Sequence, residues 1–343
     1  MPEFIKSGAF VAVIAQGLIG ASLIWDKVLL KRPGTKNLFS YVFWLGSLSV
    51  FGIALVPFGY HSLPTAVIAI AFFTGVLHLV GVFFYYSALK YGEASETLAI
   101  MGGFSPVATA LIALVLLTKQ MTGLQLFGFL LLSSGGFVMF LSEKLPLKKL
   151  LPPVLLAAGL LGLVNVLEKV VFNQTNFVSG YVWFTIGTFS GSLALLARPS
   201  WRKQIFAESG QAEPRNRFWY FANRVISGVG SFLIYYAISL THPAIVDAIG
   251  GVRYGVIFIG ALLLTKLKPN WIKEDFSGWQ LVSKTTGICL VCAGLVLVGL
   301  HGGRGNAGSP VATTQQRPQL PSPIPAAKWS EFLRHFGDSN PIK

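Results

Sequence analysis

Residues 17–28 read GLIGASLIWDKV, and residues 159–170 repeat the phrase as GLLGLVNVLEKV. Five of the twelve positions are identical, and Asp26 stands opposite Glu168, each followed by a lysine. Both stretches lie in long apolar runs, where a Gly-x-x-Gly lets a helix approach its neighbour closely. A repeated helix with a repeated acid-lysine pair indicates that the chain arose by duplication.

The composition indicates an integral membrane protein. Of the 343 residues, 53% are hydrophobic and only 12% are charged, and the mean hydropathy is +0.64, whereas a soluble domain carries about a quarter charged residues. The formal charge of +14 does not indicate nucleic-acid binding, because the basic residues gather in short connections, as determinants of membrane topology do.

Cys289 and Cys292 lie in one apolar run. A metal or redox pair is an alternative, but we interpret them as small residues buried in the membrane and expect no metal and no cofactor.

Ten apolar runs are long enough to cross a bilayer, which takes about 20 residues. The first five cover residues 8–29, 39–59, 64–89, 95–117 and 122–142. The second five cover residues 151–172, 179–197, 217–240, 244–266 and 281–301. Further landmarks repeat in the same order, such as YVFWLG at 41–46 with YVWFTIG at 181–187. Because five is odd, the second set enters the membrane in the opposite orientation. The predicted fold is an all-α membrane protein of ten transmembrane helices, an inverted repeat of two five-helix halves.

The chain divides into three parts on this interpretation. Residues 1–142 and 143–301 are the two repeats, and residues 302–343 are a disordered tail. Within the tail, a short amphipathic helix near 326–337 is predicted to lie on the membrane surface or to dock to a partner. The polar connection 198–216 is the longest internal one, a joint between the seventh and eighth runs.

The stretch YYSALKYGEASETLAIMGGFSPVATALIALVLLTKQMTGLQLFG at 85–128 carries three motifs: A-L-x-Y-x-x-A-S, a Ser-Pro within the fourth run, and T-x-x-Q-x-x-G before the fifth. With the five-plus-five repeat, this pattern resembles the EamA-like transporters of the drug/metabolite transporter superfamily over about residues 8–301. The resemblance implies a transporter whose third and eighth helices line the substrate cavity, which makes Tyr85 and Tyr235 candidate cavity residues. Aromatic packing between helices is the alternative for both.

The charge of the loops and the family resemblance predict opposite orientations in the membrane. The loops after the first, fifth, seventh and ninth runs carry most of the lysines and arginines, so the positive-inside rule places these loops in the cytoplasm and both termini outside. The family resemblance implies that both termini are inside. In either orientation the prediction is a multi-pass protein of the cell membrane.

Ionisable residues inside the apolar runs are hypotheses for a functional site, because they are expensive to bury in a bilayer. Arg253 in the ninth run is a candidate for binding a carboxylate or phosphate through both arms of its guanidinium. The alternative is a structural ion pair with Asp247, the other member of the candidate substrate site in this run. Arg224 near the start of the eighth run either binds substrate or extends its charged end to the interface.

The remaining candidates concern proton coupling and the substrate pathway. His78, in the third run, either carries a proton or is a neutral imidazole that hydrogen-bonds a neighbouring group. Asp26 and Glu168 either bind a proton or form interfacial ion pairs that anchor helix ends. Asn165 has no counterpart in the first half, and we expect it to line the pathway.

The predicted function is a secondary transporter that moves a small polar metabolite or drug by alternating access, coupled to a proton or solute gradient. A non-transporting membrane scaffold or a membrane-embedded enzyme is the alternative. An enzyme is disfavoured, because the five histidines are scattered and form no motif with acids. The expected partners are a small-molecule substrate and the lipid bilayer; a homodimer stays open, and nucleic acid is not expected.

Overall fold

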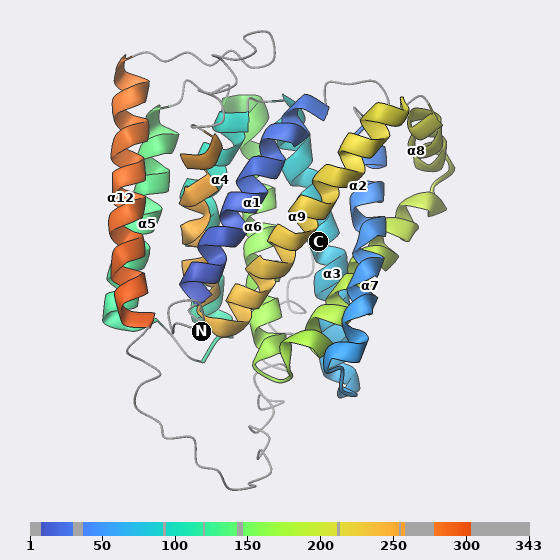
Figure 1. Cartoon of the computed structure of the whole chain (residues 1–343), viewed down its shortest axis with the longest axis horizontal. Helices are drawn as coiled ribbons and strands as arrows, with labels where there is room; N and C mark the ends of the chain where they lie inside the picture. Colours follow the sequence, from blue (N-terminus) through green and yellow to red (C-terminus); the bar gives the residue numbers. More distant parts are fainter. Residues whose placement is uncertain are drawn as a thin grey trace, which may run out of the picture. The chain divides into compact units, whose positions relative to one another are not determined.

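The computed structural model describes residues 8–29, 37–91, 94–118, 121–142, 147–210, 213–253, 255–257 and 278–302, within one compact unit of residues 1–308. Among these residues all of the regular secondary structure is helical (Figure 1). Six of the described helices are long and apolar enough to cross a membrane, and three shorter apolar helices accompany them. The prediction of an all-helical, multi-pass membrane protein is confirmed at this level.

The first half matches the predicted runs to within a few residues. Its elements are α1 (Gly8–Leu29), α2 (Leu38–Leu48) with the 3₁₀ helix η2 (Ser49–Phe58), α3 (Thr65–Tyr91), α4 (Ala94–Leu116) and α5 (Gly123–Ser142). Asn37 caps α2, because its side chain accepts hydrogen bonds from the backbone N–H groups of Phe39 and Ser40 at 2.9 and 3.2 Å. Gly59 ends η2 with φ of 118°, a left-handed conformation that favours glycine.

The second half contains a helix within residues 198–216, which were predicted from the sequence only as a polar connection. Its elements are α6 (Leu147–Phe172), α7 (Phe177–Ala194), η3 (Leu195–Ala197), α8 (Pro199–Gly210), α9 (Pro214–Leu240), α10 (Pro243–Ala248), η4 (Ile249–Gly251) and α12 (Gly278–Gly302). Helix α8 forms within the polar connection because it has an apolar side: Ile205 is fully buried, and Trp201 stacks on Phe39 at 4.9 Å between ring centroids. The connection 198–216 between the seventh and eighth runs therefore contains a helix that was not predicted from the sequence.

Two predictions lie partly or wholly outside the described residues. The ninth run, 244–266, is described only to residue 257 and with a gap, as α10, η4 and one further helical turn. The tail after residue 302, with its expected helix near 326–337, lies wholly outside them.

Helices of the two halves pack against each other in a crossed manner. Helix α1 runs along α9, α6 runs along α3, and α5 lies beside α12 (Figure 1). The second glycine of each repeated Gly-x-x-Gly lies at a close contact: a Cβ on Gly20 would be 3.3 Å from the Cα of Arg253, and one on Gly162 would be 3.1 Å from the backbone nitrogen of Thr109. The two glycines therefore have similar roles, each fitting the first helix of its half against a neighbour.

Candidate functional site

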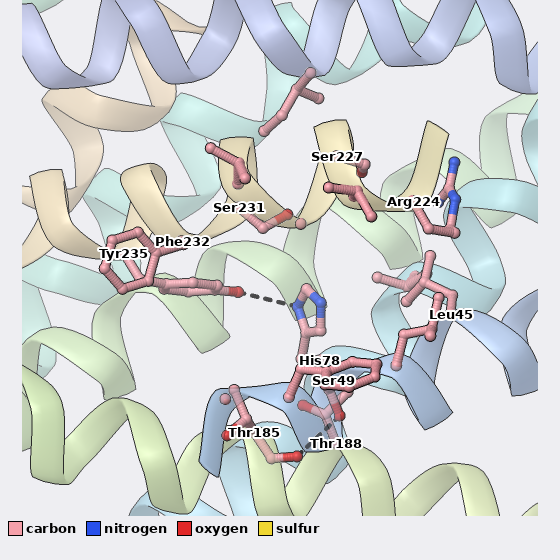
Figure 2. Close-up of a pocket in the computed structure, with 18 of the residues that line it drawn as sticks. Leu45, Ser49, His78, Thr185, Thr188, Arg224, Ser227, Ser231, Phe232 and Tyr235 are labelled. Carbon is pink, nitrogen blue, oxygen red and sulfur yellow. Dashed lines mark hydrogen bonds between the residues drawn. The ribbon is translucent and has the colours of Figure 1, made fainter. Parts of the chain in front are cut away.

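A cavity of about 810 Å³ lies among helices of both halves (Figure 2). Its size is typical of small-molecule sites, which cover roughly 300–1,000 Å³. Helices α1 to α4 and the 3₁₀ helix η2 contribute from the first half, and α6, α7, α9 and Arg253 from the second. The lining is largely apolar and aromatic. The polar residues that line it are Ser49, His78, Tyr85, Tyr86, Tyr181, Thr185, Thr188, Arg224, Ser227, Ser231, Tyr235 and Arg253.

Asp26 lies behind the cavity wall in a dense network of hydrogen bonds. Its side chain is fully buried and forms an ion pair with Arg224. It also accepts hydrogen bonds from the hydroxyl groups of Tyr41 (2.5 Å) and Tyr86 (2.8 Å) and from the amide of Asn223 (2.5 Å). The carboxylate thus has a countercharge and three further donors, the conditions under which a charge is stable in a protein interior.

Arg224 is held in the same network by aromatic rings. Its guanidinium carbon lies 5.3 Å from the ring centre of Tyr41 and 5.4 Å from that of Tyr220, distances typical of cation–π contacts. It donates a further hydrogen bond to the hydroxyl of Tyr86 at 3.0 Å. Arg224 therefore does not extend to the interface, and Asp26 pairs with this arginine in α9 rather than anchoring a helix end.

Glu168 occupies the equivalent place in α6 but has different surroundings. It is fully buried, and neither carboxylate oxygen has a hydrogen-bond partner among the described residues. The adjacent Lys169 points elsewhere, donating to the carbonyl oxygens of Ile238 and Ser239 at 2.9 Å each, at the end of α9. Repetition of the acid-lysine pair in the sequence thus does not produce the same environment twice.

His78 and Tyr235 join α3 to α9 within the cavity. The Tyr235 hydroxyl lies 3.0 Å from Nδ1 of His78, and either group donates, depending on the histidine tautomer (Figure 2). Figure 2 also shows Arg224, Ser227, Ser231 and Tyr235 following one another along α9. This helix therefore supplies a line of polar side chains along a cavity wall that is largely apolar and aromatic.

Arg253 lines the cavity, is only partly buried, and pairs with no carboxylate in the described part of the chain. Its Nε donates to the side-chain oxygen of Gln16, whose amide in turn donates to the carbonyl of Val246 at 3.1 Å. The ion pair with Asp247, the alternative to a substrate-binding role, does not form among the described residues. Asp247 instead accepts hydrogen bonds from Ser105 at 2.8 Å and Thr109 at 2.5 Å, both in α4.

The structure brings together some of the predicted site residues and separates others. Arg253, Arg224, His78, Tyr85 and Tyr235 all line the cavity. Outside its lining are Asp26, Glu168, Asp247 and Asn165, the last of them partly buried in α6.

Tyr41 and Gln16 were not among the site residues predicted from the sequence, whereas Asn223 was noted beside Arg224. A polar residue in the apolar run AVIAQGLIG was the available signal for Gln16. Among the described residues, no group of three or more His, Cys, Asp or Glu side chains is arranged to hold a metal ion.

Comparisons with known proteins agree with the fold. The model of the EamA-like transporter family matches residues 6–141. A solved structure titled only as the crystal structure of a protein superposes with a TM-score of 0.57 at 15% identity, over 88% of this chain and 98% of its own; at that identity the likeness concerns the fold alone. No curated protein matches the sequence. The family match over residues 6–141 is consistent with the resemblance to EamA-like transporters of the drug/metabolite transporter superfamily that the sequence predicts.

Proposed function

We propose that the chain is a secondary transporter of ten helices in two inverted halves, and that it moves a small organic anion across the cell membrane by alternating access. The crossed packing of α1 with α9 and of α6 with α3 supports the inverted repeat. In such folds the substrate site lies between the repeats near the middle of the bilayer. Both halves contribute to the wall of the cavity, which supports such a location for it.

The main support for the proposal is that the two arginines lining the cavity differ in their ion pairing. Arg224 is neutralised by Asp26, whereas Arg253 meets no carboxylate within the described residues and keeps donors that Gln16 does not use. A partly buried guanidinium binds a carboxylate or phosphate through two parallel hydrogen bonds. The unpaired positive charge therefore selects for an anion, and the aromatic wall selects for an apolar body attached to it.

Arg253→Gln is expected to weaken anion binding by about 1.5–3 kcal/mol, the contribution of a hydrogen bond to a charged group. The measurement is a thermal-shift titration of purified protein in detergent, against carboxylates, organic phosphates, sugars and cationic drugs, because a ligand that binds the folded state raises the melting temperature. Arg215→Gln is the control, since Arg215 is exposed in the first turn of α9. Stabilisation by cations rather than anions, or equal shifts in both variants, would refute the role of Arg253.

We assign proton coupling to Glu168 rather than to Asp26 or His78. An ionised carboxylate in the interior needs a countercharge or hydrogen-bond donors, and the described residues supply neither to Glu168. A proton would neutralise it, and the cavity residues Tyr181 and Tyr235 lie close enough to interact with its charge. Asp26 is unsuited to this role, because Arg224 and three other donors hold it.

Glu168→Gln is expected to abolish uptake driven by a proton gradient while leaving exchange of labelled for unlabelled substrate intact, because the amide can neither take up nor release the proton. The measurement is uptake into liposomes, with and without an imposed pH difference, using the anion identified by the thermal-shift titration. Glu213→Gln, at an exposed position before α9, is the control. Gradient-driven uptake that persists in Glu168→Gln would exclude this residue as the coupling site.

A further inference from the structure

We infer, building on the proposed function, that the cavity opens sideways into the bilayer between α2–η2 and α9, and that its substrate is an amphipathic anion that enters from the lipid phase. The ligand would combine an apolar chain or ring system with one carboxylate or phosphate group. We call the opening the lateral portal and define its rim by Phe51 in η2 and by Val225, Gly228 and Val229 in α9.

The portal lies at the depth of the hydrocarbon. The cavity residues of the α2–η2 span run from Leu45 to Leu55, within a span of residues 38–58, and those of α9 run from Phe221 to Tyr235, within residues 214–240. Both sets therefore occupy the middle of their spans rather than the ends. A span of this length crosses about 30 Å of hydrocarbon, so its middle faces lipid chains and not water.

The rim is apolar and exposed, although each of its residues also lines the cavity. Phe51 is 71% exposed, Val225 67% and Val229 48%. A Cβ placed on Gly228 would meet no atom within 4 Å, so there is free space in front of α9 at this point. The charged residue nearest along α9, Arg224, is buried against Asp26. An exposed apolar patch at this depth fits lipid chains, whereas the rim of a water-filled entrance would be polar.

The opposite flank of the cavity is closed by glycine packing. A Cβ on Gly75 of α3 would overlap the carbonyl of Phe184, and one on Gly187 of α7 would overlap the carbonyl of Phe72. The hydroxyl of Thr188 also donates to the carbonyl of Gly75 at 3.1 Å. The α3 and α7 backbones therefore touch and leave no passage.

The sequence explains why the two flanks differ. By the alignment of the tyrosine landmarks, Val225 in α9 corresponds to Gly75, and Ser47 in α2 corresponds to Gly187. Neither position carries a glycine of the kind that permits the backbone contact on the other flank, and the Ser47 hydroxyl lies 3.3 Å from that of Ser192 in α7 rather than against α9. In addition, η2 is held towards α7, because the Ser49 hydroxyl donates to the carbonyl of Thr185 at 2.9 Å. A ten-residue 3₁₀ helix is unusually long for its type, and here it turns Phe51 outwards beside the portal.

The test uses palmitic acid with a photoreactive diazirine in mid-chain, added to the protein in phosphatidylcholine liposomes, and mass spectrometry maps the labelled peptides. The expected result is labelling of η2 and α9 that excess palmitate removes and that excess acetate or inorganic phosphate does not. Removal by acetate or phosphate would indicate a water-borne anion and overturn the inference. If η2 and α9 are labelled but excess palmitate does not reduce the labelling, the label reports passive contact with lipid. That result would also overturn the inference.

Two kinds of substitution distinguish the role of the lateral portal from the role of the Arg253 charge. Gly228→Trp and Ser231→Trp fill the free space, and each is expected to abolish the palmitate-sensitive labelling, whereas Gly159→Trp in α6, also without an atom within 4 Å, keeps it. Arg253→Gln is expected to reduce the preference for the acid over the corresponding alcohol by about tenfold. If both portal variants had normal melting curves and unchanged labelling, the inference that the substrate enters through the lateral portal would be overturned.

The same experiment distinguishes this inference from the proposed function. Palmitate-sensitive labelling without any transport would contradict the transporter and leave the portal intact. Transport of a water-soluble anion without such labelling would contradict the portal and leave the transporter intact.

Discussion

Arg224→Met is expected to destabilise the protein by about 3–5 kcal/mol, the usual effect of removing one partner of a buried ion pair. The substitution leaves Asp26 fully buried and without its countercharge. The hydroxyl groups of Tyr41 and Tyr86 remain as donors, but they carry no charge. Reversible unfolding in mixed detergent, followed by tryptophan fluorescence, measures the change.

The double variant Asp26→Asn with Arg224→Met isolates the pair, because it removes both charges. It is expected to recover most of the lost stability, since neutral replacement of a buried pair is often tolerated. Arg215→Met, at an exposed position on the same helix, is the control and should be nearly neutral. A loss below about 1 kcal/mol for Arg224→Met would be the size of a surface pair, and the buried network described above would then be wrong.

Gly187→Leu is expected to have the second large effect, a destabilisation of about 3 kcal/mol or more, at the upper end of overpacking penalties. The new Cβ would overlap the carbonyl of Phe72, so α3 and α7 must separate along their length. The loss of the Thr188 hydrogen bond to Gly75 adds to the cost. Thermal melting in detergent, together with the monodisperse fraction on gel filtration, measures the result.

Gly159→Leu is the matched control for this substitution. It makes the same change in an apolar helix, at a position where a Cβ meets no atom within 4 Å. We expect its melting temperature to stay close to that of the unsubstituted protein. If Gly187→Leu and Gly159→Leu melted together, the closed flank between α3 and α7 would not exist as described.

The helices were predictable from the sequence because an apolar run of bilayer length has few alternatives. Each described span begins and ends within a few residues of its predicted run, apart from α6, which begins earlier at Leu147. Helix α8 was missed because its segment is polar overall. The available signals were Pro199 at the first helical position and the i, i+4 spacing of Trp201 and Ile205, which places both on one face.

The surroundings of the candidate site residues were harder to predict than their identity. Duplication identified Asp26 and Glu168 as a pair, but the partner of Asp26 comes from α9, almost 200 positions away in the sequence. Tertiary packing alone decides such a contact. The suggested pair of Arg253 and Asp247 failed for a simpler reason: residues six apart lie on different faces of a helix, since neighbours are three or four apart.

Counterflow tests the central claim most directly. Liposomes containing the protein are loaded with the unlabelled anion identified by thermal shift, and a trace of labelled anion is added outside with no pH or electrical gradient. Alternating access predicts that the label first accumulates inside above its equilibrium level and then declines, and that Arg253→Gln weakens this overshoot. Labelled anion that merely equilibrates, or stays outside although it binds, would show that the cavity is a channel or a binding site and not the substrate site of a transporter.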